Sequence, residues 1–177
     1  MDLQQILAVA FLWVVLLAIF GLWAWRMATS TFNLAQAAAY VVSLFLVRFQ
    51  WRARVEGTLD IPDGGGAVIV CNHRSSLDPC FVQTSFHRKI HWMVAREYCE
   101  SKALGWFLRI CEVIPVGRGG VDTQATKLAL RRVQNGEVVG MLPEGRINMS
   151  DDLLLPVRPG AARVALKCRV PLFPVYI

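Results

Sequence analysis

The sequence predicts an α/β fold, with a mixed, largely parallel sheet flanked by helices and an N-terminal membrane-embedded helical hairpin in front of it. Short apolar runs alternate with longer amphipathic runs from residue 67 onward, and this alternation is typical of parallel sheets. Two apolar runs come before residue 54, and the whole chain is 55% hydrophobic with a mean hydropathy of +0.42. We therefore expect a membrane anchor over residues 1–54 and an α/β domain over residues 55–177.

The first apolar run covers residues 6–25 and reads ILAVAFLWVVLLAIFGLWAW, with no charged residue. A helix of this length is about 30 Å long, which matches the hydrocarbon core of a bilayer. A secretory signal peptide would carry Lys or Arg in front of the run, whereas the one charged residue there is Asp2. We expect a membrane helix.

The second apolar run covers residues 34–47 and is short for a membrane span. An interfacial or half-inserted helix and the core of a tilted span both stay open. Arg48, Arg52 and Arg54 follow this run, while the loop between the two runs holds only Arg26. The positive-inside rule then predicts a hairpin with both ends, and the domain that follows, on the cytoplasmic face of the membrane.

The remaining elements follow in order from the apolar periodicity. Residues 55–66 form a polar break with a Gly-rich tip, for which we expect an early strand and a turn. Apolar runs predict strands over residues 67–71, 90–95, 112–116, 138–142 and 170–177. Amphipathic runs predict helices over residues 79–87, 97–109, 122–134 and 159–167. The last strand ends in Tyr176-Ile177 without a polar tail, from which we expect a chain truncated at its C-terminus.

Charge and cysteine content narrow the function classes. The net charge of +6 beside a membrane anchor suits anionic headgroups and anionic substrates. Nucleic acid is not an expected partner, because no basic run is interleaved with aromatic residues. The five cysteines form no CxxC and are expected to be reduced and buried. No set of residues has the spacing of metal ligands, so we expect no metal.

The segment CNHRSSLDP, residues 71–79, holds the main candidate site. His73 follows a predicted strand by two residues, which places it at the carboxyl edge of the sheet, where α/β folds bind ligands. Asp78 comes five residues later, and along a continuous helix two such side chains lie about 140° apart. They can meet only across a turn, and Arg74-Ser75-Ser76 is turn-prone.

Two interpretations of Asp78 stay open at this point. Asp followed by Pro is a natural helix N-cap with Pro at the first helical position. Alternatively, the carboxylate holds the His73 imidazole and fixes its tautomer, leaving the second ring nitrogen free to take a proton. A carboxylate has two oxygens, so one group could serve both purposes.

Four blocks of the chain resemble the motifs of the glycerolipid acyltransferase family, which includes glycerol-3-phosphate and 1-acylglycerol-3-phosphate acyltransferases. Asn72-His73-x-Ser75-x-x-Asp78 resembles its first motif, NHxSxxD, a form of HxxxxD. The other three resembling blocks follow in the family's order, VIPVGR at 113–118, PEGR at 143–146 and VPLFPV at 170–175. Arg96 stands where relatives carry Lys, and the similarity covers residues 55–177. The third block departs from PEGTR by lacking the Thr, so Arg146 comes one position early.

The resemblance implies a membrane-bound enzyme of phospholipid biosynthesis. Such an enzyme moves a fatty acyl group from acyl-CoA or acyl carrier protein to the hydroxyl of a lysophospholipid acceptor such as lysophosphatidate. His73 would be the general base, oriented by Asp78, and the acyl donor would be a substrate rather than a cofactor. The motif residues implied to bind substrate are Asn72, Ser75, Arg96, Arg118, Glu144, Gly145, Arg146 and Pro171.

The chemistry of the residues agrees with that implication. Acyl transfer from a thioester to an alcohol needs a base for the hydroxyl proton, and a thioester is already activated, so no acyl-enzyme is required. Cys71 is the rival nucleophile, but as a strand residue it is expected to pack inward. Glu144 is expected to orient Arg118 or Arg146, or to bind acceptor hydroxyls. Alternative functions are a CoA-independent phospholipid transacylase and a non-catalytic module that binds lipids or anions at the membrane.

Overall fold

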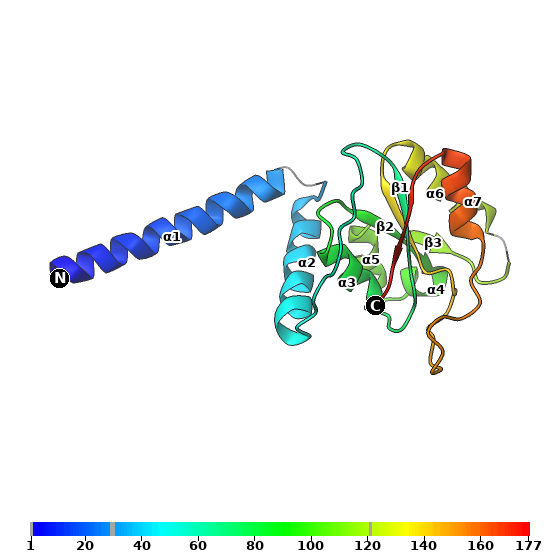
Figure 1. Ribbon diagram of the computed structural model, residues 1–177, viewed down its shortest axis with the longest axis horizontal. Helices are drawn as coiled ribbons and strands as arrows, with labels where there is room; N and C mark the ends of the chain where they lie inside the picture. The colour runs from blue at the N-terminus through cyan, green and yellow to red at the C-terminus, as the bar shows by residue number, and fades with distance from the viewer. Residues whose placement is uncertain (1, 29–30, 121) are drawn as a thin grey trace.

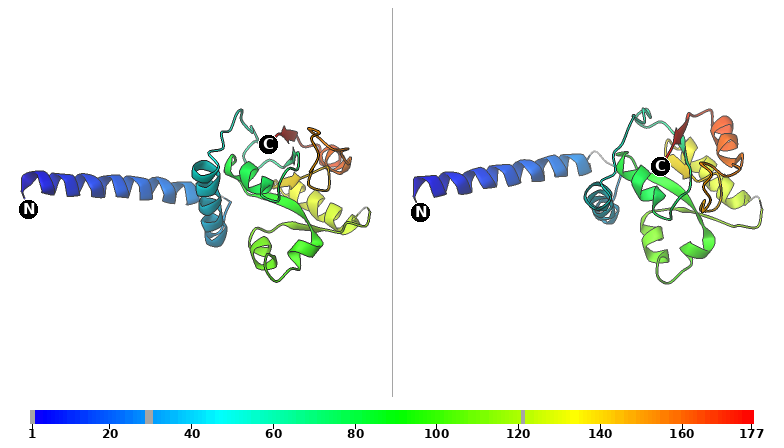
Figure 2. Two further views of the ribbon diagram at one scale, coloured as in Figure 1. Left: turned by 90° about the horizontal axis from the view of Figure 1, so that it is seen from below. Right: turned by 60° about the horizontal axis from the view of Figure 1, so that its bottom comes forward.

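The computed structural model describes residues 2–28, 31–120 and 122–177. Helix α1 (Leu3–Ala28) extends away from a compact body formed by the rest of the chain (Figures 1 and 2). The side chains of residues 3–23 are almost all exposed, and the most apolar 18-residue window within Leu3–Trp25 has a mean hydropathy of 2.7. By length and composition this helix could cross a membrane.

Helix α2 (Leu34–Phe45) and the π-helical turn η1 (Leu46–Gln50) lie along the compact body. Asn33 caps α2 through a reciprocal capping box with Gln36. One face of this segment is buried and includes Ala37, Tyr40 and Val47, while its other face exposes large apolar side chains such as Phe45. The predicted second apolar run therefore docks on the α/β domain with one face and leaves the other face open.

In the part of the chain that the structure describes, five parallel strands form the sheet, in the order β3-β2-β4-β1-β5. Their bounds are β1 Ala67–Cys71, β2 Ile90–Ala95, β3 Ile114–Val116, β4 Val138–Met141 and β5 Leu172–Val175. The predicted α/β class is confirmed, and every strand pair among the described residues is parallel. Since the strands are parallel, the segments that follow them meet at one edge of the sheet.

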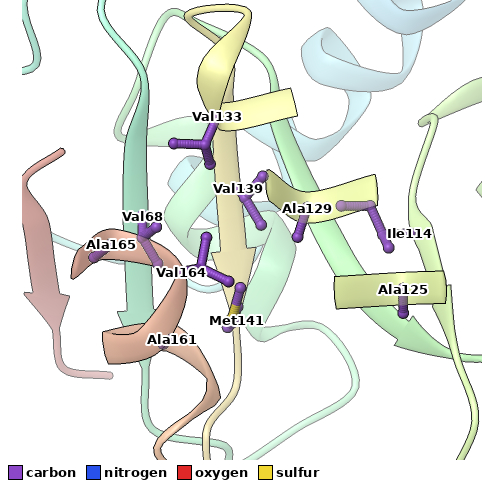
Figure 3. Packing of buried hydrophobic residues seen from close by; sticks show 10 residues of the cluster. All are labelled: Val68, Ile114, Ala125, Ala129, Val133, Val139, Met141, Ala161, Val164 and Ala165. Atoms are coloured by element: carbon purple, nitrogen blue, oxygen red, sulfur yellow. The ribbon is translucent and has the colours of Figure 1, made fainter. Parts of the chain in front are cut away.

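Helices cover both faces of the sheet. Helices α6 (Thr123–Gln134) and α7 (Gly160–Cys168) pack on one face, where Val68, Val139 and Met141 of the strands meet alanine and valine side chains of the two helices (Figure 3). Helix α3 (Asp78–Thr84) contributes Val82 to the cluster on the other face. Burying such a valine contributes about 1.5–3 kcal/mol, so the two clusters fix the sheet that carries the site.

Two of the sequence expectations about elements are wrong. The described residues 55–66 form no strand, because this segment makes only a local turn at its Gly-rich tip. The single helix expected over 97–109 is divided into α4 (Arg96–Cys99) and α5 (Gly105–Ile110). The chain reverses between them so sharply that a Cβ on Gly105 would lie 2.5 Å from the Cys99 carbonyl oxygen, which leaves no room for an unbroken helix.

Candidate active site

Most of the predicted site residues lie where strands end at the carboxyl edge of the sheet. Asn72 and His73 follow β1, Arg96 follows β2, Arg118 follows β3, and Glu144 follows β4. Pro171 is an exception, because it precedes β5 and its carbonyl oxygen accepts from the Val68 N–H at the amino end of β1. The structure thus places Pro171 at the opposite edge of the sheet from His73, and its part in substrate binding stays a prediction.

His73 and Asp78 are in direct contact. Nδ1 of His73 lies 2.9 Å from Oδ2 of Asp78. The Asp78 side chain is 2% exposed, whereas that of His73 is 15% exposed. An ionised carboxylate can only accept, so the ring nitrogen that faces it acts as the donor, and in that neutral tautomer Nε2 keeps its lone pair. No hydrogen bond from the described residues occupies Nε2.

Asp78 does not cap a helix. Helix α3 begins at Asp78 itself, and its N-cap is Leu77, which makes no side-chain cap bond. Oδ2 of Asp78 instead turns back and accepts from the backbone N–H groups of Arg74 at 2.7 Å and Ser75 at 2.9 Å. The carboxylate therefore organises the turn that carries His73 while it holds the imidazole, and the capping interpretation is wrong.

Glu144 fixes the main chain at His73. Its Oε1 accepts from the His73 N–H at 2.6 Å, and its Oε2 accepts from the Leu155 N–H at 3.0 Å. The side chain is buried and makes no ion pair with Arg118 or Arg146 among the described residues. The geometry differs from the expectation that Glu144 orients an arginine, because both carboxylate oxygens already serve backbone donors.

Asn148 is a second clamp, which was not predicted from the sequence. Its N–H donates to the His73 carbonyl at 2.6 Å, so both backbone polar groups of His73 are held by the loop after β4. The buried Asn148 side chain accepts from the Ser150 N–H and donates to the Asp152 carbonyl. The turn-prone run Asn-Met-Ser-Asp-Asp was the available signal.

The remaining first-motif residues hold the local chain. The Asn72 amide exchanges hydrogen bonds with the backbone N–H and carbonyl of Ile177, at 2.8 and 3.0 Å. The Ser75 hydroxyl oxygen accepts from the Leu77 N–H at 3.2 Å. The Arg74 guanidinium donates to the Ser150 carbonyl at 2.8 Å. These contacts tie the turn after β1 to β5 and to the loop after β4.

Two candidate phosphate-binding arginines are paired with acids. Arg118 lies 2.8 Å from Glu97 and over the ring of Tyr98, with 60% of its side chain exposed. Arg96 lies 3.3 Å from Asp122. Backbone N–H groups of Ala125 and Gly117 and then Arg96 lower the Asp122 pKa to about 2. An ion pair exposed on both sides, such as Arg118–Glu97, contributes only about 0–1 kcal/mol, so an anionic ligand can compete for Arg118 at little cost.

Cys71 is not suited to be a nucleophile. Burial, and after it the negative charges of Asp78 and Glu144, raises the pKa of the thiol to about 12. At neutral pH the reactive thiolate is therefore almost unpopulated. Among residues 2–28, 31–120 and 122–177, no group of three or more His, Cys, Asp or Glu side chains could hold a metal ion.

The sequence of this chain is similar to those of known proteins. The model of the Acyltransferase family matches residues 52–177. A Bacillus subtilis protein named 1-acyl-sn-glycerol-3-phosphate acyltransferase is 28% identical over 116 residues, which cover 65% of this chain and 57% of that protein. A Streptococcus pneumoniae protein of the same name is 25% identical over 138 residues, covering 76% of this chain and 50% of that protein. The chain thus spans about half the length of these curated relatives.

A solved structure shows the same fold. The 1-acyl-sn-glycerophosphate (LPA) acyltransferase PlsC from Thermotoga maritima superposes with a TM-score of 0.56 at 20% identity. The superposition covers 95% of this chain and 71% of the Thermotoga chain.

Proposed function

Because the chain belongs to the Acyltransferase family, we propose that it moves a fatty acyl group from acyl-CoA or acyl carrier protein to the hydroxyl of a lysophosphatidate-like acceptor. The observation that carries the proposal is the 2.9 Å contact between His73 and the buried Asp78, at the carboxyl edge of a parallel sheet. The names of the relatives support this acceptor class.

In the proposed reaction, Nε2 of His73 takes the proton of the acceptor hydroxyl as its oxygen attacks the thioester carbonyl. The new carbon–oxygen bond forms first, and the tetrahedral intermediate then expels the thiolate and leaves an ester. The imidazolium returns its proton to the thiolate, so protons balance within one turnover. Asp78 stabilises the imidazolium and keeps Nδ1 protonated.

Binding of the anionic parts of the substrates is assigned to the arginines of this edge. Arg118, Arg146 and Arg96 are proposed as phosphate ligands, with Arg118 leaving Glu97 when an acceptor binds. Asn72, Ser75, Glu144 and Gly145 are proposed to shape the site through the turn that carries His73. A backbone N–H near Gly145 would be the donor to the oxyanion.

The membrane would set the approach of the substrates. We propose that α1 inserts into the bilayer, that the exposed apolar face of α2 lies at its surface, and that the domain sits on the cytoplasmic face. Helix α2 also packs on α3 and so supports the domain. Deleting residues 1–30 therefore separates membrane binding from folding better than deleting the whole proposed anchor, residues 1–54. The shorter deletion should weaken vesicle binding and leave the domain folded.

The test is thiol release from acyl-CoA by the purified chain in vesicles, measured with and without lysophosphatidate. Release that depends on lysophosphatidate, together with labelled phosphatidate as product, supports the proposal. Transfer from a phospholipid without any CoA thioester would instead show a transacylase. Lysophosphatidate binding without transfer from acyl-CoA, acyl carrier protein or phospholipid would show a binding module.

A further inference from the structure

Arg158, which lies outside the four motif blocks, is held at the turn after β4. Its backbone N–H donates to the Pro143 carbonyl at 2.9 Å, which fixes the chain beside residues 143–145. Three residues earlier, the Leu155 N–H donates to Glu144, whose other oxygen holds the His73 backbone. The segment before α7 is therefore bound to the same turn that clamps His73.

The Arg158 side chain folds over Gly145. A Cβ built on Gly145 would lie 3.2 Å from Cζ, 3.3 Å from Nε and 3.5 Å from an Nη of Arg158. Gly145 has φ = 72°, a conformation that residues with a Cβ rarely adopt. Glycine thus supplies both the turn and the space that the guanidinium occupies.

The charge of Arg158 is not neutralised within the described chain. Three other arginines at this edge have acceptors, since Arg74 donates to main-chain carbonyls, Arg96 meets Asp122 and Arg118 meets Glu97. Glu144 is adjacent in sequence to Gly145, but both of its oxygens accept from backbone N–H groups. No hydrogen bond or ion pair from described residues holds the exposed Arg158 guanidinium.

From these contacts we propose that Arg158 is a phosphate-binding residue for a substrate, acting beside Gly145 at the turn that positions His73. The assignment rests on the proposed function and extends it to a residue outside the motifs. A guanidinium offers a planar fork of donors that matches a phosphate monoester. Both the acceptor phosphate and the 3′-phosphate of CoA have this chemistry, and the experiment distinguishes them.

The kinetic test compares Arg158→Gln and Arg158→Lys with the full unsubstituted chain in vesicles, varying lysophosphatidate and acyl-CoA separately. Arg163→Gln is the matched control, because Arg163 is an exposed arginine on α7 with no described side-chain partner. Arg158→Gln should raise one of the two KM values about ten- to a hundredfold with kcat changed much less, and Arg158→Lys should recover part of it. Arg163→Gln should change neither KM. The Arg158 variants must match the parent by circular dichroism.

The substrate whose KM rises identifies the phosphate that Arg158 binds. A raised acceptor KM, together with lost preference for lysophosphatidate over monoacylglycerol, assigns Arg158 to the acceptor phosphate. A raised acyl-CoA KM that is absent with a 3′-dephospho-CoA thioester assigns it to the donor. Unchanged KM values, or changes that Arg163→Gln reproduces, overturn the assignment.

Two further measurements keep this assignment separate from the proposed reaction. Gly145→Ala places a Cβ against the guanidinium, so its effect on KM should be smaller in the Arg158→Gln background than in the parent. Calorimetry of the full chain with glycerol 3-phosphate and with CoA should show binding of at least one of them, and Arg158→Gln should weaken that ligand's binding by the same ten- to hundredfold. Such binding in a chain without turnover would refute the reaction and retain the site, whereas no binding of either ligand to the parent chain would refute the site.

Discussion

Replacing Asp78 by asparagine removes one negative charge from the site and can keep its hydrogen-bond pattern. All three contacts, from the Arg74 N–H, the Ser75 N–H and Nδ1 of His73, converge on the single oxygen Oδ2. An asparagine whose amide oxygen takes the place of Oδ2 can accept the same three bonds. The substitution therefore tests the charge of Asp78 separately from the shape of the turn.

The expected loss of kcat in Asp78→Asn depends on how much the negative charge of Asp78 stabilises the imidazolium. A hydrogen bond to a charged group contributes about 1.5–3 kcal/mol, and losing that support for the imidazolium lowers kcat about ten- to 150-fold. Where the amide NH₂ faces the ring instead, Nδ1 becomes the acceptor and the wrong tautomer forms, which extends the loss toward about 10⁴-fold. The free energy of unfolding should change by less than about 1 kcal/mol, because both backbone donors keep an acceptor.

Asp78→Ala is the matched comparison. Alanine removes the acceptor of the Arg74 and Ser75 N–H groups, and each donor left unpaired costs about 1–3 kcal/mol. The assay is acyl-CoA thiol release at saturating lysophosphatidate, beside urea unfolding of each variant in the same detergent. A well-folded Asp78→Asn chain with the parent kcat would refute the assignment of Asp78 to the imidazolium.

Three further predictions address other contacts. Glu144→Gln should lower both kcat and unfolding free energy, by about 1–3 kcal/mol for the latter, because an amide cannot accept from both the His73 and Leu155 N–H groups; equal urea midpoints would contradict this. Arg118→Ala should raise the KM of lysophosphatidate about ten- to a hundredfold and spare that of acyl-CoA, with Arg118→Lys recovering part; the reverse pattern would assign Arg118 to the donor. Burial lowers the pKa of His91 from 6.5 in the folded chain. As the pH falls, the imidazole of the unfolded chain is therefore protonated before that of the folded chain. The stability that neutral His91 contributes is present above pH 6.5 and is lost as the pH falls through the folded pKa. Urea unfolding from pH 7.5 to 5.5 should show a larger loss in the parent than in His91→Gln, and equal slopes would contradict the burial of a neutral imidazole.

The periodicity of the sequence was sufficient for the fold class and for the edge that carries the site. Apolar runs such as residues 67–71 mark strands whatever lies beside them, and parallel strands bring His73 and Glu144 to the same edge. The order of the strands was not predictable in this way. Strand β5 pairs with β1, and β4 lies between β1 and β2. Both pairings join segments that are distant in sequence, so the periodicity of a single segment does not reveal them.

The sequence predicted which residues lie in the site more readily than it predicted their hydrogen-bond partners. Asp78 followed by Pro79 has the local chemistry of a helix N-cap, but α3 already begins at Asp78. Its carboxylate accepts from the Arg74 N–H of the preceding turn instead of from the N–H groups of the helix. Glu144 was expected to orient an arginine or to bind acceptor hydroxyls. Its oxygens instead accept from the His73 N–H on the turn after β1 and from the Leu155 N–H eleven residues further along the chain. Asn148 was missed for the same reason, since its bond to His73 joins two segments that are distant in sequence.

The most direct test of the proposed function is turnover by His73→Ala beside His73→Gln in the full chain. His73 is held by its backbone to Glu144 and Asn148, so both variants should keep the fold by circular dichroism and the parent KM values within a few-fold. Loss of the general base should lower kcat by about 10²–10⁴, measured as labelled phosphatidate formed from acyl-CoA and lysophosphatidate. Folded variants that turn over at the parent rate would contradict the assignment of His73 as the base.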